Sequence, residues 1–171
     1  GLVGSEMCIR DRWSPRYQTR PHREVFYIGI DSCVPDMEIE SRTSRIPLIR
    51  EAYDDAVLGE KIKEKLSFIM HRNYGDFINY WNERKSYKGL TYGAVQYPSL
   101  YMGAGEQRII KFLETIYSIP DYSLILIDEL DLTLHTEALL RLMQVLNDEC
   151  NTRNIQIVFT SHREELLDCN L

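Results

Sequence analysis

The stretch SLILIDE at residues 123–129 decides the fold class of this chain. Four consecutive aliphatic residues that end in two acids are typical of a short strand covered on both faces. A second apolar run, NIQIVFT at residues 154–160, follows a segment with helical spacing that begins near Thr136. Two buried strands joined by a helix predict a right-handed crossover, so we expect an α/β fold with a mostly parallel sheet flanked by helices.

The sequence on either side of these strands extends the pattern. A helix is predicted over residues 106–119 and ends before Pro120. Its apolar face comprises Ile109, Phe112, Leu113 and Ile116. After the second strand, Ser161 and Glu164 have the spacing of a capping box, which predicts a further helix. Because chemistry collects at the carboxyl ends of parallel strands, we expect a functional site where the two strands end.

The amino-terminal half of the chain gives weaker signals. Residues 24–31, EVFYIGID, have the β-branched and aromatic content of a buried strand. Residues 44–75 carry apolar residues at helical spacing, with breaks expected near Gly59 and Gly75. Residues 76–106 are rich in tyrosine and glycine, and we expect a short helix there followed by one or two strands.

Composition places the chain among ordinary globular proteins. Of its 171 residues, 44% are hydrophobic and 27% are charged, which argues against disorder. No apolar run is long enough to span a bilayer, so no membrane segment is expected. The net charge of −6 gives no overall attraction to nucleic acid, and no basic, aromatic stripe supports direct DNA binding. The four cysteines show neither a metal-like nor a disulfide pattern, which suits a reducing cytosol.

Residues 1–12, GLVGSEMCIRDR, resemble a translated sequencing adapter rather than natural protein. One reading frame of the transposase adapter encodes LVGSEMCIRD, which matches residues 2–11 without a gap. We therefore exclude residues 1–12 from the fold. We also expect the natural protein to continue upstream; a genuine amino-terminus is the alternative.

Three short segments carry residues suited to chemistry, and each also has a purely structural explanation. Asp128 and Glu129 end a predicted strand, where they could hold Mg²⁺ and accept a proton from water, or could simply be solvated acids. His162 follows the second strand and could contact a phosphate, or could be a surface histidine. The loop MGAGEQ at residues 102–107 leaves bare amides before a helix, as a phosphate site would, or could form a tight turn.

Taken in order, these segments resemble the carboxyl-terminal half of an ABC-type ATPase, of the AAA-like branch that includes SMC-, RecF- and OLD-like proteins. MGAGEQ is similar to the signature motif, LILIDE to Walker B with its adjoining glutamate, LDLTLH to the D-loop region and IVFTSH to the switch-histidine strand. We interpret residues 101–171 as the ATPase core and residues 13–100 as the variable strand and helical insert that precedes the signature. The motif GxxxxGK[ST] does not occur in the sequence, so we expect an incomplete P-loop NTPase that lacks the Walker A lobe.

The resemblance implies a role for each residue of these motifs. Glu129 would be the general base, His162 would contact the γ-phosphate, and Asp128 would assist in binding Mg²⁺. The other nucleotide-contacting residues would be Gly103, Ala104, Gly105 and Glu106 in the signature loop, and Asp131 and His135 in the D-loop region. Gly103 stands where the family usually has serine, so a hydroxyl contact to phosphate is lost.

The resemblance also implies a function. ATP and Mg²⁺ would bind between two ATPase subunits, as a homodimer or a pair, with the signature loop of one subunit closing over the nucleotide of the other. The chain alone would be inactive without the Walker A lobe. A nucleotide-gated clamp or sensor is the alternative, and a small α/β domain that binds no nucleotide is a third. The branch serves DNA repair or phage defence, often beside a nuclease or other effector, in a cytoplasmic setting.

Overall fold

The computed structural model describes residues 23–39, 48–82 and 85–166. A parallel sheet forms its centre, and the strand order is β1-β6-β7. The strands are β1 (Val25–Ile28), β6 (Leu124–Ile127) and β7 (Gln156–Phe159). The runs SLILIDE and NIQIVFT are therefore neighbouring parallel strands, as predicted, and the α/β class is confirmed.

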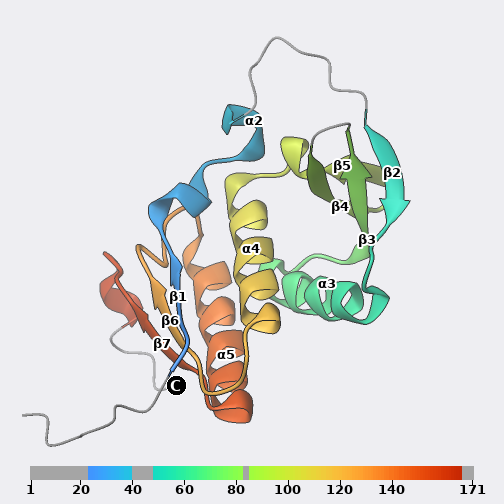
Figure 1. The fold of residues 1–171 in the computed structure, drawn as a ribbon. Coiled ribbons are helices and arrows are strands. Elements are labelled where there is room, and N and C mark those ends of the chain that lie inside the picture. The colour runs from blue at the N-terminus through green and yellow to red at the C-terminus, as the bar shows by residue number, and fades with distance from the viewer. Residues whose placement is uncertain (1–22, 40–47, 83–84, 167–171) are drawn as a thin grey trace, which may run out of the picture.

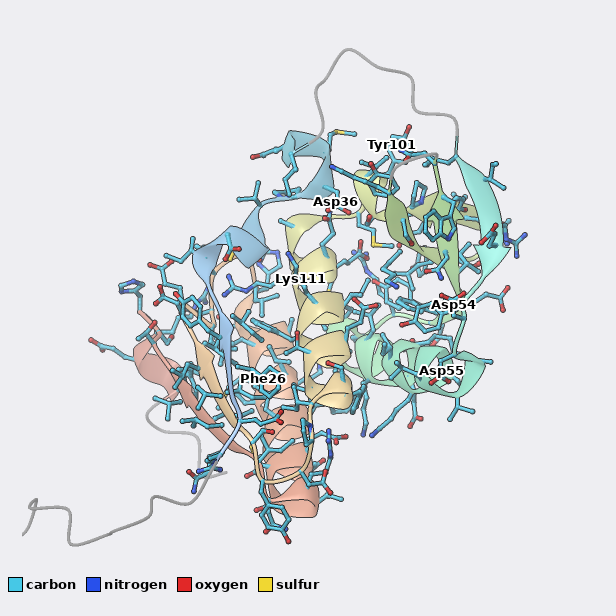
Figure 2. All side chains as sticks on the ribbon, in the orientation of Figure 1. Phe26, Asp36, Asp54, Asp55, Tyr101 and Lys111 are labelled. Carbon is cyan, nitrogen blue, oxygen red and sulfur yellow. The ribbon has the colours of Figure 1, made fainter. Side chains whose placement is uncertain are left out.

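Helices α4 (Ala104–Ser118) and α5 (Thr136–Arg153) lie on the same side of this sheet (Figure 1). The predicted apolar face of α4 is confirmed, because its four residues are at most 1% exposed. Phe26 of β1 packs against the same core (Figure 2). On the other side of the sheet, Val25, Tyr27 and Val158 are each more than half exposed, so the prediction that the strands are covered on both faces is wrong.

A second, antiparallel sheet with the order β2-β3-β4-β5 lies on the far side of α4 from β1 (Figure 1). Its strands are β2 (Ile49–Ala52), β3 (Tyr74–Trp81), β4 (Ser86–Tyr92) and β5 (Val95–Pro98). Helix α3 (Ala56–Met70) begins at Asp55, whose carboxylate accepts a hydrogen bond from the Leu58 amide at 3.0 Å. The buried face of α3 joins the hydrophobic core that α4 and α5 share, so both sheets are built around one core.

The amino-terminal half differs from the sequence prediction in two places. Within residues 44–75, where a helix was expected, the strand β2 comes first and the helix α3 follows. Gly59 does not break this helix, because it is buried inside α3. A Cβ at Gly59 would lie 2.9 Å from the Tyr53 ring, so this glycine allows close packing. The short helix expected after Gly75 is wrong; these residues form β3, whose pairing with β4 decides their conformation.

Short segments connect these elements at the end of the molecule where α4 begins. They are η1 (Ile30–Cys33), α2 (Asp36–Ile39) and η2 (Ser99–Tyr101). After β7, the turn η3 (Glu164–Leu166) replaces the start of the expected helix. The capping box is wrong, because the Ser161 hydroxyl accepts a hydrogen bond from the Arg163 amide at 3.1 Å.

Two further expectations concern the chain as a whole. The excluded residues 1–12 lie outside the described residues. Within the described part of the chain, no helix is long and apolar enough to cross a membrane.

Candidate functional site

Two acids and a threonine meet where β6 and β7 end. The Thr160 hydroxyl donates a hydrogen bond to Asp128 Oδ1 at 2.7 Å and accepts one from the Glu129 amide at 2.8 Å. The Leu130 amide donates to the Thr160 carbonyl at 2.9 Å, which continues the pairing of the two strands beyond the sheet. The structure therefore holds Asp128 at a fixed position on the edge where the sequence predicted a site.

Glu129 has an unusual backbone and a histidine neighbour. Its φ of 50° is left-handed, which is uncommon for a residue other than glycine. His162 Nε2 lies 3.4 Å from Glu129 Oε1, and the side chains are 79% and 27% exposed, respectively. The two residues assigned to catalysis from the sequence are thus brought together, at an edge that solvent or a ligand can reach.

The segment LDLTLH at residues 130–135, predicted to be the D-loop region, is bound to the end of β7. The Asp131 carboxylate accepts a hydrogen bond from the His162 amide at 3.3 Å and lies 3.8 Å from the Arg163 guanidinium. Burial alone would raise the pKa of Asp131, but hydrogen bonds from Ser161 and from backbone amides outweigh it and lower that pKa. His135, by contrast, is the exposed N-cap residue of α5, and its side chain makes no capping hydrogen bond.

The loop before α4 combines an open glycine with a crowded one. A Cβ at Gly103 would have no heavy atom within 4 Å, so a larger residue would fit there. A Cβ at Gly105 would lie 2.9 Å from the Thr133 carbonyl oxygen, so this glycine lets α4 touch the D-loop region. Gly103 and Ala104 stand at the start of the helix, where backbone amides and the helix dipole favour an anion.

Glu106 turns its carboxylate into the protein. It is only 6% exposed and accepts hydrogen bonds from the Tyr74 hydroxyl and from Arg72, the latter at 2.9 Å. Its second oxygen accepts a hydrogen bond from the Gly103 amide at 3.3 Å, across the first turn of α4. Burial is the main cause that raises the pKa of the Tyr74 hydroxyl, and the hydrogen bond to Glu106 is the second cause. Glu106 therefore ties the loop to β3, and the loop's amides are better placed than this carboxylate to meet a ligand.

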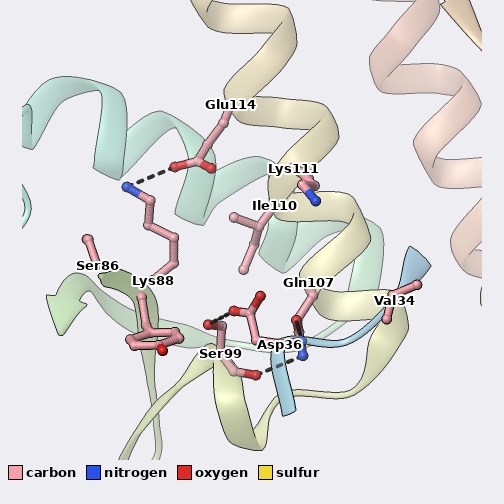
Figure 3. A pocket seen from close by; sticks show the side chains of 10 residues that line it. Val34, Asp36, Ser86, Lys88, Ser99, Gln107, Ile110, Lys111 and Glu114 are labelled. Carbon is pink, nitrogen blue, oxygen red and sulfur yellow. Dashed lines mark hydrogen bonds and ion pairs between the residues drawn. The ribbon is translucent and has the colours of Figure 1, made fainter. Parts of the chain in front are cut away.

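Gln107 fastens the same turn on its other side, as Figure 3 shows. Its amide nitrogen donates to the Ser99 and Met102 carbonyls at 2.8 and 3.1 Å, and its oxygen accepts from the Asp36 amide at 2.9 Å. Gln107, Ser99 and Asp36 border a pocket of about 150 Å³ between α4 and the antiparallel sheet. The start of α4 is thus held by both neighbouring segments, α2 and η2.

Two residues that organise the site were not predicted from the sequence. Thr160 bridges Asp128 and Glu129, and Arg108 of α4 donates hydrogen bonds to backbone carbonyls of the loop after β6. Arg108 precedes Phe112 by one helical turn, so a charge on the apolar face of a predicted helix was the available signal. Thr160 gave no such signal, because threonine is common at the ends of strands.

Comparison with known protein families gives an independent result. Residues 10–168 match the family described as "AAA domain, putative AbiEii toxin, Type IV TA system". The chain belongs to this family. Membership in an AAA domain family confirms the coarser part of the resemblance, a nucleotide-binding, P-loop ATPase-like domain. The SMC-, RecF- and OLD-like branch remains a prediction, and no individual curated protein matches the chain.

AAA-type ATPases generally use ATP with Mg²⁺, and the strand ends of this AAA domain fit that pair. Among the described residues, no cluster of three His, Cys, Asp or Glu side chains could hold a metal ion. Mg²⁺ in nucleotide sites takes only one or two protein carboxylates and completes its shell with water and phosphate oxygens. A single carboxylate beside a hydroxyl, as in Asp128 and Thr160, is compatible with that chemistry.

Proposed function

We propose that this AAA domain supplies parts of two composite ATP sites at the interface of paired subunits. Asp128, Glu129 and His162 would serve one nucleotide, and the signature loop at residues 103–106 would close over the nucleotide of the facing subunit. The P-loop would come from sequence outside these 171 residues, since no GxxxxGK[ST] motif occurs within them. The observation that carries the proposal is the Thr160-linked cluster, in which Asp128, Glu129 and His162 share one sheet edge.

The residues of this cluster suit hydrolysis by in-line attack of water. Bound Mg²⁺ would neutralise charge on the phosphates. Asp128, fixed by Thr160, would hold the ion through its free oxygen. Glu129 would accept the proton of the attacking water, and His162, 3.4 Å away, would donate a hydrogen bond to the γ-phosphate. The exposure of both side chains leaves them free to reach a nucleotide that arrives from the P-loop side.

The surface around the signature loop supports an interface with a second copy. Tyr101, directly before the loop, is 70% exposed, and Figure 2 shows it at the end of the molecule where α4 begins. Val34, Met37 and Leu132 are exposed at between 37% and 48%, around the same end. Apolar side chains that surround a polar site are typical of surfaces that bury themselves against a partner. A homodimer would cover them.

The proposal is tested by steady-state ATP hydrolysis of the complete gene product. Glu129→Gln should lower kcat by about 100-fold or more, because it removes the general base while keeping the shape of the side chain. Glu137→Gln is the matched control, since Glu137 is an exposed acid in the first turn of α5 that pairs with Arg141. Equal turnover of the wild type and the Glu129 variant would reject Glu129 as the general base. A complete protein that neither binds nor hydrolyses ATP would reject the function.

A nucleotide-gated clamp is the second candidate, and Gly103 favours it. Without a hydroxyl at this position, the loop has only backbone amides to offer a γ-phosphate, which favours weak discrimination over fast hydrolysis. Light scattering with ATP, run beside phosphate release, separates the two functions. ATP-dependent dimers with negligible release indicate a clamp, whose effector would be a nuclease or another protein. Dimers that release phosphate at each cycle indicate an ATPase.

A further inference from the structure

Arg108 is the largest fully buried side chain of the described residues, and its charge lies inside the protein. It is 0% exposed, in the second turn of α4, and its Nε atom has no hydrogen-bond partner. Burial lowers the pKa of this guanidinium, while the carboxylates of the site partly restore it. Burying a cation is expensive, so the groups that receive its hydrogen bonds show what it stabilises.

The hydrogen bonds of Arg108 converge on the loop that carries the proposed general base. Nη2 donates to the carbonyls of Asp128 and Glu129 at 3.0 and 2.6 Å. Nη1 donates to the Leu132 carbonyl at 3.1 Å and also contacts the Cys33 thiol. Three carbonyls of one loop thus turn toward a single side chain that comes from a different element.

Two of these carbonyls flank the Cα atom of Glu129. The Glu129 amide is bonded in turn to the Thr160 hydroxyl at 2.8 Å, and the Glu129 carbonyl also accepts a hydrogen bond from the Leu132 amide at 3.0 Å. The backbone around this one residue is thus held by four hydrogen bonds. A left-handed conformation is unfavourable for a residue with a Cβ atom. The φ of 50° at Glu129 therefore needs support, and Arg108 supplies two of the four bonds from outside the loop.

The helix that carries Arg108 also begins with the signature loop. One turn before Arg108, a Cβ at Gly105 would lie 2.9 Å from the Thr133 carbonyl oxygen, so α4 approaches the loop after β6 closely at two points on one face. A shift of the first turn of α4 would move both contacts together, because a helix is stiff over one turn.

We propose that Arg108 is a positioning residue that holds the Glu129 backbone in its left-handed conformation. It would also couple α4, which begins with the signature loop, to the general base. The inference rests on the proposed function, because only an ATPase needs Glu129 aimed at a water molecule. Contact between a partner's nucleotide and the signature loop would be communicated to Glu129 through this guanidinium. Lysine cannot replace it, because one ammonium group cannot span the carbonyls of residues 128, 129 and 132.

The first test uses amide hydrogen exchange of the 171-residue chain. Arg108→Lys should speed exchange at the Leu130 and Leu132 amides by about 10-fold, because the loop loses its clamp. Arg153→Lys is the matched control: Arg153 also donates to backbone carbonyls, those of Ile116 and Ile119, but at the far end of α4. Unchanged exchange in the Arg108 variant, or equal changes in both variants, would overturn the inference.

The second test is kinetic and uses the complete gene product. Arg108→Lys should lower kcat by about 10- to 100-fold and leave the KM for ATP within about 2-fold, because a misaimed base impairs chemistry and not binding. A rise in KM with kcat unchanged would contradict a positioning role. A wild-type protein without ATPase activity would sink the proposed function, whereas the exchange experiment would still decide whether Arg108 holds the Glu129 backbone.

A third measurement needs no substitution, and it covers the case in which the Arg108 variant does not fold. Couplings across hydrogen bonds in the NMR spectrum of the wild type should connect the Arg108 guanidinium with the carbonyl carbons of residues 128, 129 and 132. A guanidinium that shows no such coupling and exchanges freely with solvent would overturn the inference.

Discussion

Gly105→Ala should destabilise the protein, although alanine is the better helix former. The added methyl would lie 2.9 Å from the Thr133 carbonyl oxygen and 3.4 Å from a methyl of Leu134. A backbone carbonyl cannot swing aside as a long side chain can, so we expect an overpacking cost of about 2–3 kcal/mol. The helix propensity of alanine offsets about 0.5–1 kcal/mol. The net loss of unfolding free energy is roughly 1–2.5 kcal/mol.

Thermal unfolding of the 171-residue chain measures this loss. For a chain of this size, 1 kcal/mol corresponds to a Tm change of about 2–4 °C, so Tm should fall by roughly 2–10 °C. Gly103→Ser is the matched control, since its Cβ meets nothing within 4 Å and its hydroxyl can cap α4. It should gain a few tenths of a kcal/mol. A Gly105→Ala protein as stable as the wild type would refute the close contact between α4 and the D-loop region.

Three other substitutions test single side chains in the same way. Thr160→Val keeps the side-chain shape but removes the hydrogen bonds to both Asp128 and Glu129; it should cost about 1–3 kcal/mol in urea unfolding and speed exchange of the Glu129 amide. Tyr74→Phe removes a buried hydrogen bond to the charged Glu106 and should cost about 1.5–3 kcal/mol in the same assay. Asp131, whose pKa is lowered in the folded state, contributes stability above pH of about 3.9 that is lost as pH falls through the lower, folded value. Asp131→Asn should therefore flatten the acid limb of the stability curve below about pH 4.

The parts of the fold that could be predicted from the sequence are those that burial alone determines. SLILIDE and NIQIVFT are continuous apolar runs, and their prediction as neighbouring strands is confirmed, although only one face of the sheet is buried. The apolar face of α4 follows from its helical spacing. Once two strands are parallel, their carboxyl ends lie at one edge, so the proximity of Asp128 and His162 followed from topology.

The parts that could not be predicted depend on contacts between distant residues. β3 has enough apolar residues for a helix, and only its pairing with β4 makes it a strand. Gly59 was predicted to break a helix, but it instead leaves room for the Tyr53 ring, which lies in the preceding loop. The inward turn of Glu106 depends on Tyr74, 32 residues away, and the reach of Arg108 to Glu129 spans 21 residues.

A crystal structure of the complete gene product with Mg²⁺ and a non-hydrolysable ATP analogue tests the central claim most directly. We predict a dimer in which each triphosphate lies against Asp128, Glu129 and His162 of one subunit and against the signature loop at residues 103–106 of the other. A triphosphate bound away from both the strand ends and the signature loop would contradict the account.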